Sequence, residues 1–235
     1  MKLIHFVGGF ASHKGRNLTD LELISMHLAK QIYPEASINA WTLKESWANL
    51  PEYCTKQIVP ENILYNWINF PIKHGEHMSD KVRLFVLLLK GGLYIDTDVL
   101  CLRRLPEKYV DKICFAKQSR NNKSQIINNG IIYAPYAGHK VLEAYLGKYY
   151  NAKSMGQWET LSCRGLYSAY CEHKDLCNLF KYYEFHGTGW PVKLLHEVPN
   201  RLDKAYFWHL MGKNKEINSK SILHYAETEL CLNIR

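Results

Sequence analysis

Apolar runs and helical stripes alternate along the first part of the chain. Residues 2–7 form an apolar run that a glycine pair closes, which is typical of a buried strand. Between residues 18 and 33, apolar side chains recur at intervals of three or four, as on one face of a helix, and Pro34 follows. Residues 37–42 favour a second strand. The opening therefore predicts a β-α-β unit with parallel strands.

The alternation continues through the rest of the chain. Further expected helices cover residues 61–70, 79–90, 139–150 and 157–171, and further expected strands cover residues 93–96, 112–116, 130–134 and 221–225. This order predicts the α/β class, with a mainly parallel central sheet flanked by helices. Ligands of such sheets bind beyond the carboxyl ends of the strands. No internal repeat or convincing interdomain linker interrupts the pattern.

The most informative segment, residues 79–98, reads S-D-K-V-R-L-F-V-L-L-L-K-G-G-L-Y-I-D-T-D. Ser79 is the expected helix N-cap, and Asp80 and Arg83 share a helical face because they are three residues apart. The six apolar residues at 84–89 predict a buried helix, which the glycines at 91–92 end. Burying Asp80 and Arg83 is costly unless they pair with each other or with a polar ligand.

Two carboxylates, Asp96 and Asp98, follow the next apolar strand and are separated by one residue. Side chains at positions i and i+2 of a strand point the same way, so both carboxylates can face a single ion. Such an arrangement suits a hard divalent cation that holds a diphosphate. The segment therefore indicates a metal-dependent enzyme that acts on a nucleotide diphosphate.

Composition narrows the class of protein. Hydrophobic residues make up 47% and charged residues 22% of the chain, and no run approaches the ~20 apolar residues of a membrane span. The net charge is +8, but the basic residues are dispersed, so we expect no nucleic-acid partner. A basic face toward anionic lipid or a phosphorylated acceptor and an ordinary solvated surface both fit this charge. Seven cysteines without a C-x-x-C pair favour reduced thiols in a cytoplasm over a zinc site.

The chain resembles the DXD-containing sugar transferases of glycosyltransferase family 32, which include bacterial capsule and lipooligosaccharide transferases. A similar core occurs in the large clostridial glucosylating toxins. The resemblance rests mainly on Ser79-Asp80-x-x-Arg83 and Gly91-Gly92-x-Tyr94-x-Asp96-x-Asp98, with weaker echoes at residues 3–8, 41–42 and 222–226. It implies a GT-A fold, a nucleotide-diphosphate donor of the UDP-sugar kind, Mn²⁺ or Mg²⁺, and transfer with retention at the anomeric carbon. It also implies one catalytic domain over residues 1–235, with a donor-binding half at 1–135 and an acceptor-side half at 136–235.

The resemblance further implies a role for each matching residue. Asp96 and Asp98 are the expected catalytic residues, and together with His224 they are the expected metal ligands. The expected donor-binding residues are His5, Val7, Asp80, Arg83, Tyr94, Asp96 and Asn129. The chain departs from the family's pattern after His224, where Glu229 and Leu230 replace a Ser-Trp pair, and it lacks the family's acceptor-side segment. The acceptor site is therefore left open.

The expected function is a retaining glycosyltransferase that moves a sugar to a glycan or glycolipid acceptor, in surface polysaccharide or lipooligosaccharide synthesis. We expect it in the cytoplasm, with peripheral contact to the anionic inner face of the membrane as a further option. Two alternatives stay open: a protein-modifying glycosyltransferase effector, and a non-catalytic domain that binds a nucleotide sugar or a glycan. A haloacid dehalogenase-type phosphatase fits less well, because Leu100 stands where that class needs threonine or valine.

Overall fold

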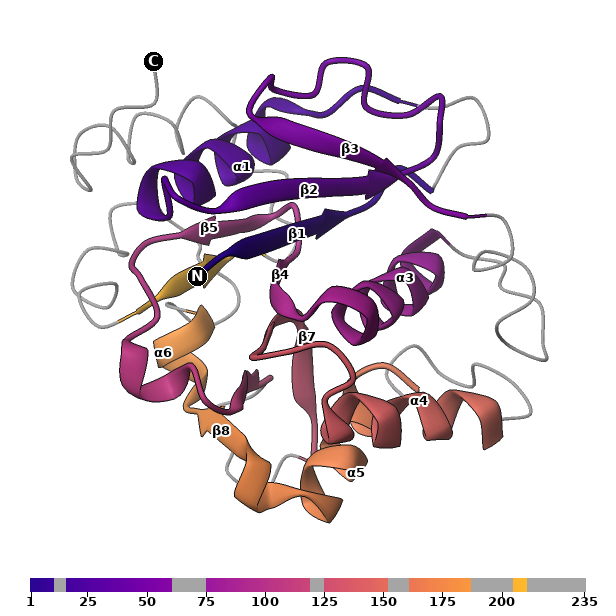
Figure 1. Cartoon of the computed structure of the whole chain (residues 1–235), viewed down its shortest axis with the longest axis vertical. Helices are drawn as coiled ribbons and strands as arrows, with labels where there is room; N and C mark the ends of the chain where they lie inside the picture. Colours follow the sequence, from indigo (N-terminus) through magenta and orange to yellow (C-terminus); the bar gives the residue numbers. More distant parts are fainter. Residues whose placement is uncertain (11–15, 61–74, 119–124, 152–160, 187–204, 211–235) are drawn as a thin grey trace.

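A mainly parallel sheet forms the centre of the computed structural model, which describes residues 1–10, 16–60, 75–118, 125–151, 161–186 and 205–210 (Figure 1). Among these residues the sheet has seven strands in the order β3-β2-β1-β4-β7-β6-β8, and β7 is the strand that runs antiparallel to its neighbours. The strands are β1 (Leu3–Val7), β2 (Ser37–Thr42), β3 (Cys54–Ile58), β4 (Gly92–Ile95), β6 (Ile113–Lys117), β7 (Ile127–Ala134) and β8 (Cys177–Phe180). The predicted fold class is confirmed.

Helices cover both faces of this sheet. They are α1 (Asp20–Ile32), α3 (Gly75–Lys90), α4 (Lys140–Asn151), α5 (Cys163–Glu172) and α6 (Tyr182–His186), with short 3₁₀ turns at Glu107–Tyr109 and Lys174–Leu176. Successive residues of one strand enter different cores: Tyr94 packs with α3, α4 and α5, whereas Leu93 and Ile95 pack with α1 and α6. This alternation is the period-two pattern of a strand buried on both sides.

A second, two-stranded antiparallel sheet lies beside the first and consists of β5 (Val99–Cys101) and β9 (Phe207–His209). Because β5 follows β4 after a single turn, the chain passes from the large sheet into the small one at residues 96–98. Helix α1 lies against β5, and α6 lies against β9. Residues far apart in the sequence therefore meet around this turn.

The helix that precedes β4 departs in one detail from the sequence-based prediction. It begins at Gly75 rather than after Ser79, and the Ser79 hydroxyl donates to the Gly75 carbonyl at 3.2 Å, so the assignment of Ser79 as N-cap is wrong. The helix ends as expected, at Gly91 and Gly92, whose φ angles are 63° and 92°. The expected helix at 61–70 and strand at 221–225 lie outside the described residues. Among those described, no helix is long and apolar enough to cross a bilayer.

Candidate metal and donor site

Asp96 and Asp98 lie on the turn that joins β4 to β5. The Asp96 amide donates to the Gly130 carbonyl of β7 at 2.8 Å, and the Val99 amide closes the turn by donating to the Asp96 carbonyl at 3.1 Å. The carboxylates converge as predicted, but the reason given from the sequence was wrong. Residues 97–98 form a turn, so the bend of the backbone, and not strand alternation, brings the two side chains together.

A third potential ligand, His209, comes from β9. It stands opposite Val99 in the small sheet, and its Nε2 atom lies 3.3 Å from Asp98 Oδ1. One ligand atom from each of Asp96, Asp98 and His209 lies within 4.8 Å of the other two. Sequence reasoning missed His209, because only strand pairing places it at the motif. It assigned His224 instead, which lies outside the described residues, so that role stays a prediction.

Asp98 and His209 influence each other's ionisation. Burial favours the neutral form of Asp98, but the charge and hydrogen bond of His209 outweigh it and lower the pKa of the carboxyl. Burial likewise favours neutral His209, yet Asp98 raises the pKa of the imidazole above its ordinary value of 6.5. The Asp98 side chain is 23% exposed and that of His209 is 7% exposed, so the carboxylate faces the solvent side of the pair.

Arg83 connects the helix residues of the motif to its carboxylates. Its guanidinium lies 3.2 Å from Asp80 Oδ1 and 3.1 Å from Asp96 Oδ1, and it donates to the Asn129 carbonyl at 2.6 Å. Although burial works in the opposite direction, Asp96 and Asp80 raise the pKa of Arg83, which stays charged. The expectation that buried Asp80 and Arg83 must pair is met.

Tyr94 and Asn129 complete this network from β4 and β7. The Tyr94 hydroxyl donates to the Asp96 carboxylate, and Arg83 stacks over the Tyr94 ring at 4.6 Å from its centroid. The Asn129 amide donates to Asp80 Oδ1 at 2.8 Å. The structure therefore brings five of the predicted residues into one connected polar cluster, whose member Asp96 lies close to Asp98.

Gly130 provides the close approach that this cluster needs. A Cβ atom at this position would lie 2.5 Å from Asp96 Oδ2 and 2.8 Å from His209 Cε1. A side chain there would fill the space in which the carboxylate and the imidazole stand side by side. The oxygen and nitrogen donors suit Mn²⁺ or Mg²⁺, and a histidine among them shifts the preference toward Mn²⁺.

Two predicted donor-binding residues, His5 and Val7, lie in the β1 strand with buried side chains. The Trp41 indole donates to His5 Nδ1 at 3.2 Å, and His5 Nε2 lies 2.9 Å from the Gly91 carbonyl, so both ring nitrogens have protein partners. Burial lowers the pKa of His5 to about 4 and keeps the ring neutral. Val7 packs in the core beside Trp41. Direct contact of either side chain with a donor stays a prediction, and the observed packing gives both a supporting role in the sheet.

Comparison with known proteins adds to this geometry. Residues 25–119, about two fifths of the chain, match the family described as glycosyltransferase sugar-binding region containing DXD motif. This matched stretch is therefore similar to a DXD-containing sugar-binding region of glycosyltransferases. The matched residues include Asp80, Arg83, Asp96 and Asp98. His209 is not among them and joins the site through the pairing of β9 with β5. The resemblance drawn from the sequence is confirmed, and a comparison with curated proteins finds no match.

Solved glycosyltransferases share the fold around this DXD region. The chain superposes on the galactosyltransferase LgtC, in complex with donor and acceptor sugar analogs, with a TM-score of 0.54 at 14% identity over 97% of this chain and 94% of that one. It superposes on a glycosyltransferase involved in glycosylation of the major capsid of PBCV-1 with a TM-score of 0.50 at 10% identity, over 97% and 100% of the two chains. At these identities the likeness establishes the fold, and the GT-A prediction is confirmed.

Proposed function

We propose that the chain is a metal-dependent glycosyltransferase that moves a sugar from a nucleotide-diphosphate donor to a glycan or glycolipid acceptor. The observation that carries the proposal is the convergence of Asp96, Asp98 and His209 on one point, at the carboxyl end of β4 in a GT-A fold. We assign these three residues as ligands of Mn²⁺ or Mg²⁺. When bound, such an ion neutralises the diphosphate leaving group and so favours cleavage of the sugar–phosphate bond.

The polypeptide prepares this site in two ways. Arg83 lies within ion-pairing distance of both Asp80 and Asp96, so its positive charge offsets part of the repulsion between the two carboxylates. The fixed bonds from Tyr94 and Asn129 hold Asp96 and Asp80 in place, which spares the cost of ordering them when the donor arrives. Asp80 and Arg83 are our candidates for contact with the donor sugar, where a hydroxyl would enter their existing network.

Finer parts of the proposal draw on the family resemblance. They are a UDP-sugar donor, retention at the anomeric carbon, donor binding by residues 1–135 with acceptor binding by residues 136–235, and a role in surface polysaccharide or lipooligosaccharide synthesis. The net charge of +8 supports an anionic acceptor or work beside the anionic inner face of a membrane. Assignment of the product anomer by NMR would test retention.

A screen of nucleotide sugars by thermal shift, with and without Mn²⁺, tests the central proposal. A donor present at a hundred times its Kd adds about 2.7 kcal/mol of stability, which for a chain of this size raises Tm by roughly 5–10 °C. We expect a shift that needs both Mn²⁺ and the nucleotide sugar, together with slow metal-dependent hydrolysis of the same donor. A sugar-binding domain without activity would show the shift but no hydrolysis, and a phosphatase would prefer phosphate monoesters. No metal-promoted binding of any nucleotide sugar would overturn the proposal.

A further inference from the structure

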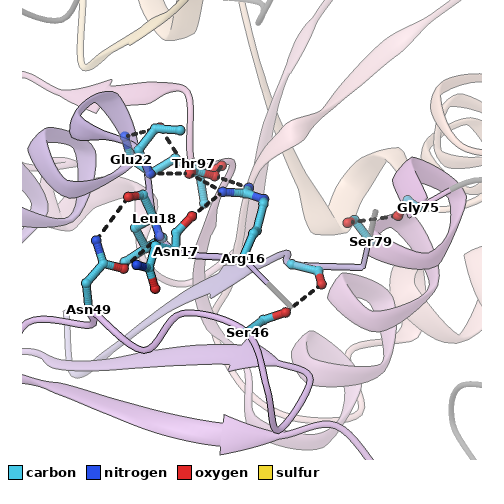
Figure 2. A network of polar contacts seen from close by, with 11 residues as sticks. Arg16, Asn17, Leu18, Glu22, Ser46, Asn49, Gly75, Ser79 and Thr97 are labelled. Atoms are coloured by element: carbon cyan, nitrogen blue, oxygen red, sulfur yellow. Dashed lines mark hydrogen bonds and ion pairs between the residues drawn. The ribbon is translucent and has the colours of Figure 1, made fainter. Parts of the chain in front are cut away.

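The middle residue of the Asp96-Thr97-Asp98 motif is tied to a distant helix. The Thr97 hydroxyl donates to Glu22 Oε1 at 3.0 Å, across 75 residues of sequence (Figure 2). Glu22 lies in the first turn of α1, and its residue is 7% exposed. A threonine hydroxyl on a turn can hydrogen-bond to water instead. Its bond to a buried carboxylate is therefore a specific tertiary contact.

Glu22 uses its two carboxylate oxygens for different tasks. Oε2 accepts from the Thr19 amide at 2.9 Å and so completes the capping box that starts α1. Oε1 accepts from Thr97 and from Arg16, whose guanidinium binds both oxygens at 2.6 and 2.7 Å. Capping alone needs one oxygen. The second oxygen and the bidentate arginine fix the carboxylate in the orientation that meets Thr97.

A second contact from α1 reaches the other side of Asp98. The buried Ser25 hydroxyl donates to the Val99 carbonyl, and Ser25 lies three residues after Glu22 on the same face of the helix. Helix α1 thus bonds to Thr97 and Val99, the two neighbours of Asp98. A turn that is held on both sides has little freedom to rotate the carboxylate between them.

We propose that Glu22 is a positioning residue that, through Thr97, aims Asp98 at the metal and thereby sets the affinity of the site for its ion. This inference rests on the proposed function, because it needs a metal at Asp96, Asp98 and His209. Groups that hydrogen-bond to a metal ligand typically change metal affinity by 10-fold to 100-fold, and Glu22 acts one step further out, on the residue before Asp98. Glu22 also lies outside the residues that match the glycosyltransferase region, which begin at residue 25.

The test compares Mn²⁺ binding of the full chain and its variants, measured with Mn²⁺ alone by electron paramagnetic resonance. Thr97→Val keeps the shape of the side chain and the helix cap but removes the hydroxyl, and we expect it to weaken Mn²⁺ binding by about 10-fold or more. Thr97→Ser keeps the hydroxyl and should bind like the wild type. Thr55→Val, at an exposed position of β3, serves as the matched control and should also bind like the wild type.

The link to Glu22 is tested by a double-mutant cycle. Glu22→Gln can still cap α1 through its one oxygen but loses the charge that fixes Arg16, so we expect a loss similar to that of Thr97→Val. If the two residues act as one unit, the double variant should bind no more weakly than the weaker single variant. Additive losses, or a Thr97→Val variant that binds Mn²⁺ like the wild type, would overturn the positioning role alone. A wild type that binds no Mn²⁺ on its own would overturn this inference, whereas the proposed function is overturned only if no nucleotide sugar shows metal-promoted binding.

Discussion

Gly130→Ala is the substitution that most directly tests the geometry of the proposed metal site. The new Cβ would lie 2.5 Å from Asp96 Oδ2 and 2.8 Å from His209 Cε1, whereas ordinary contact starts at 3.4 Å. The carboxylate oxygen must therefore move by about 0.9 Å and the imidazole by about 0.6 Å. Metal–ligand distances tolerate only about 0.2 Å. Because the crowded atoms are side-chain ends, the ligands should yield and the backbone should not.

We expect Gly130→Ala to fold, with a circular dichroism spectrum like that of the wild type, and to lose at least tenfold in Mn²⁺ affinity by isothermal titration calorimetry. Gly147→Ala is the matched control, because a Cβ at this position of α4 meets no atom within 4 Å. It should bind Mn²⁺ normally and gain roughly 0.5–1 kcal/mol of stability from helix propensity. If Gly130→Ala bound Mn²⁺ as tightly as the control, Asp96 and His209 would not be joint ligands.

Three further predictions concern single residues of the site. Asp98→Ala should lower turnover with a purified donor by orders of magnitude while the fold stays intact, and near-normal turnover would contradict its assignment as a ligand. Asp80→Asn should weaken binding of a nucleotide sugar more than binding of the free nucleotide; equal losses in calorimetry would remove Asp80 from the sugar site. Mn²⁺ affinity should rise as the pH passes the raised pKa of His209, above 6.5, because the ion must displace its proton, and His209→Gln should flatten this rise. Without metal, the ion pair with Asp98 stabilises the fold below pH 6.5, and this stability is lost as the pH rises through the raised pKa.

The parts of the fold that the sequence predicts well are those with a strong local signal. The first strand, the capped helix that follows it and the second strand were placed within two residues of their observed bounds, because glycine, proline and the helical stripe mark their ends. Strand β3 was missed: its pattern of exposure is irregular, and none of its five residues is buried. Strands β5 and β9 were missed because three residues carry no readable period.

The residues of the candidate site likewise fall into those that the sequence identifies and those that it does not. Asp80, Arg83, Asp96 and Asp98 stand within 19 residues of sequence, so their fixed spacing could be recognised without a structure. His209 could not, since a histidine in the short apolar run from Phe207 to Leu210 looks like a packed core residue until β9 pairs with β5. Glu22 was equally hidden, because the capping box gives its carboxylate a complete local explanation.

His209 and Glu22, which the sequence did not reveal, both contact the turn between β4 and β5, where the two sheets meet. Asp96 is fixed by the large sheet through the Gly130 carbonyl, whereas the Asp98 carbonyl accepts from the Leu210 amide next to β9 in the small sheet. The proposed metal site thus lies where the large sheet meets the small one, at the short turn through which the chain passes from β4 to β5. Because Asp96 is bonded to one sheet and Asp98 to the other, bonds from a third element to this turn further restrain the two carboxylates. Helix α1, with contacts on each side of Asp98, is placed to supply them.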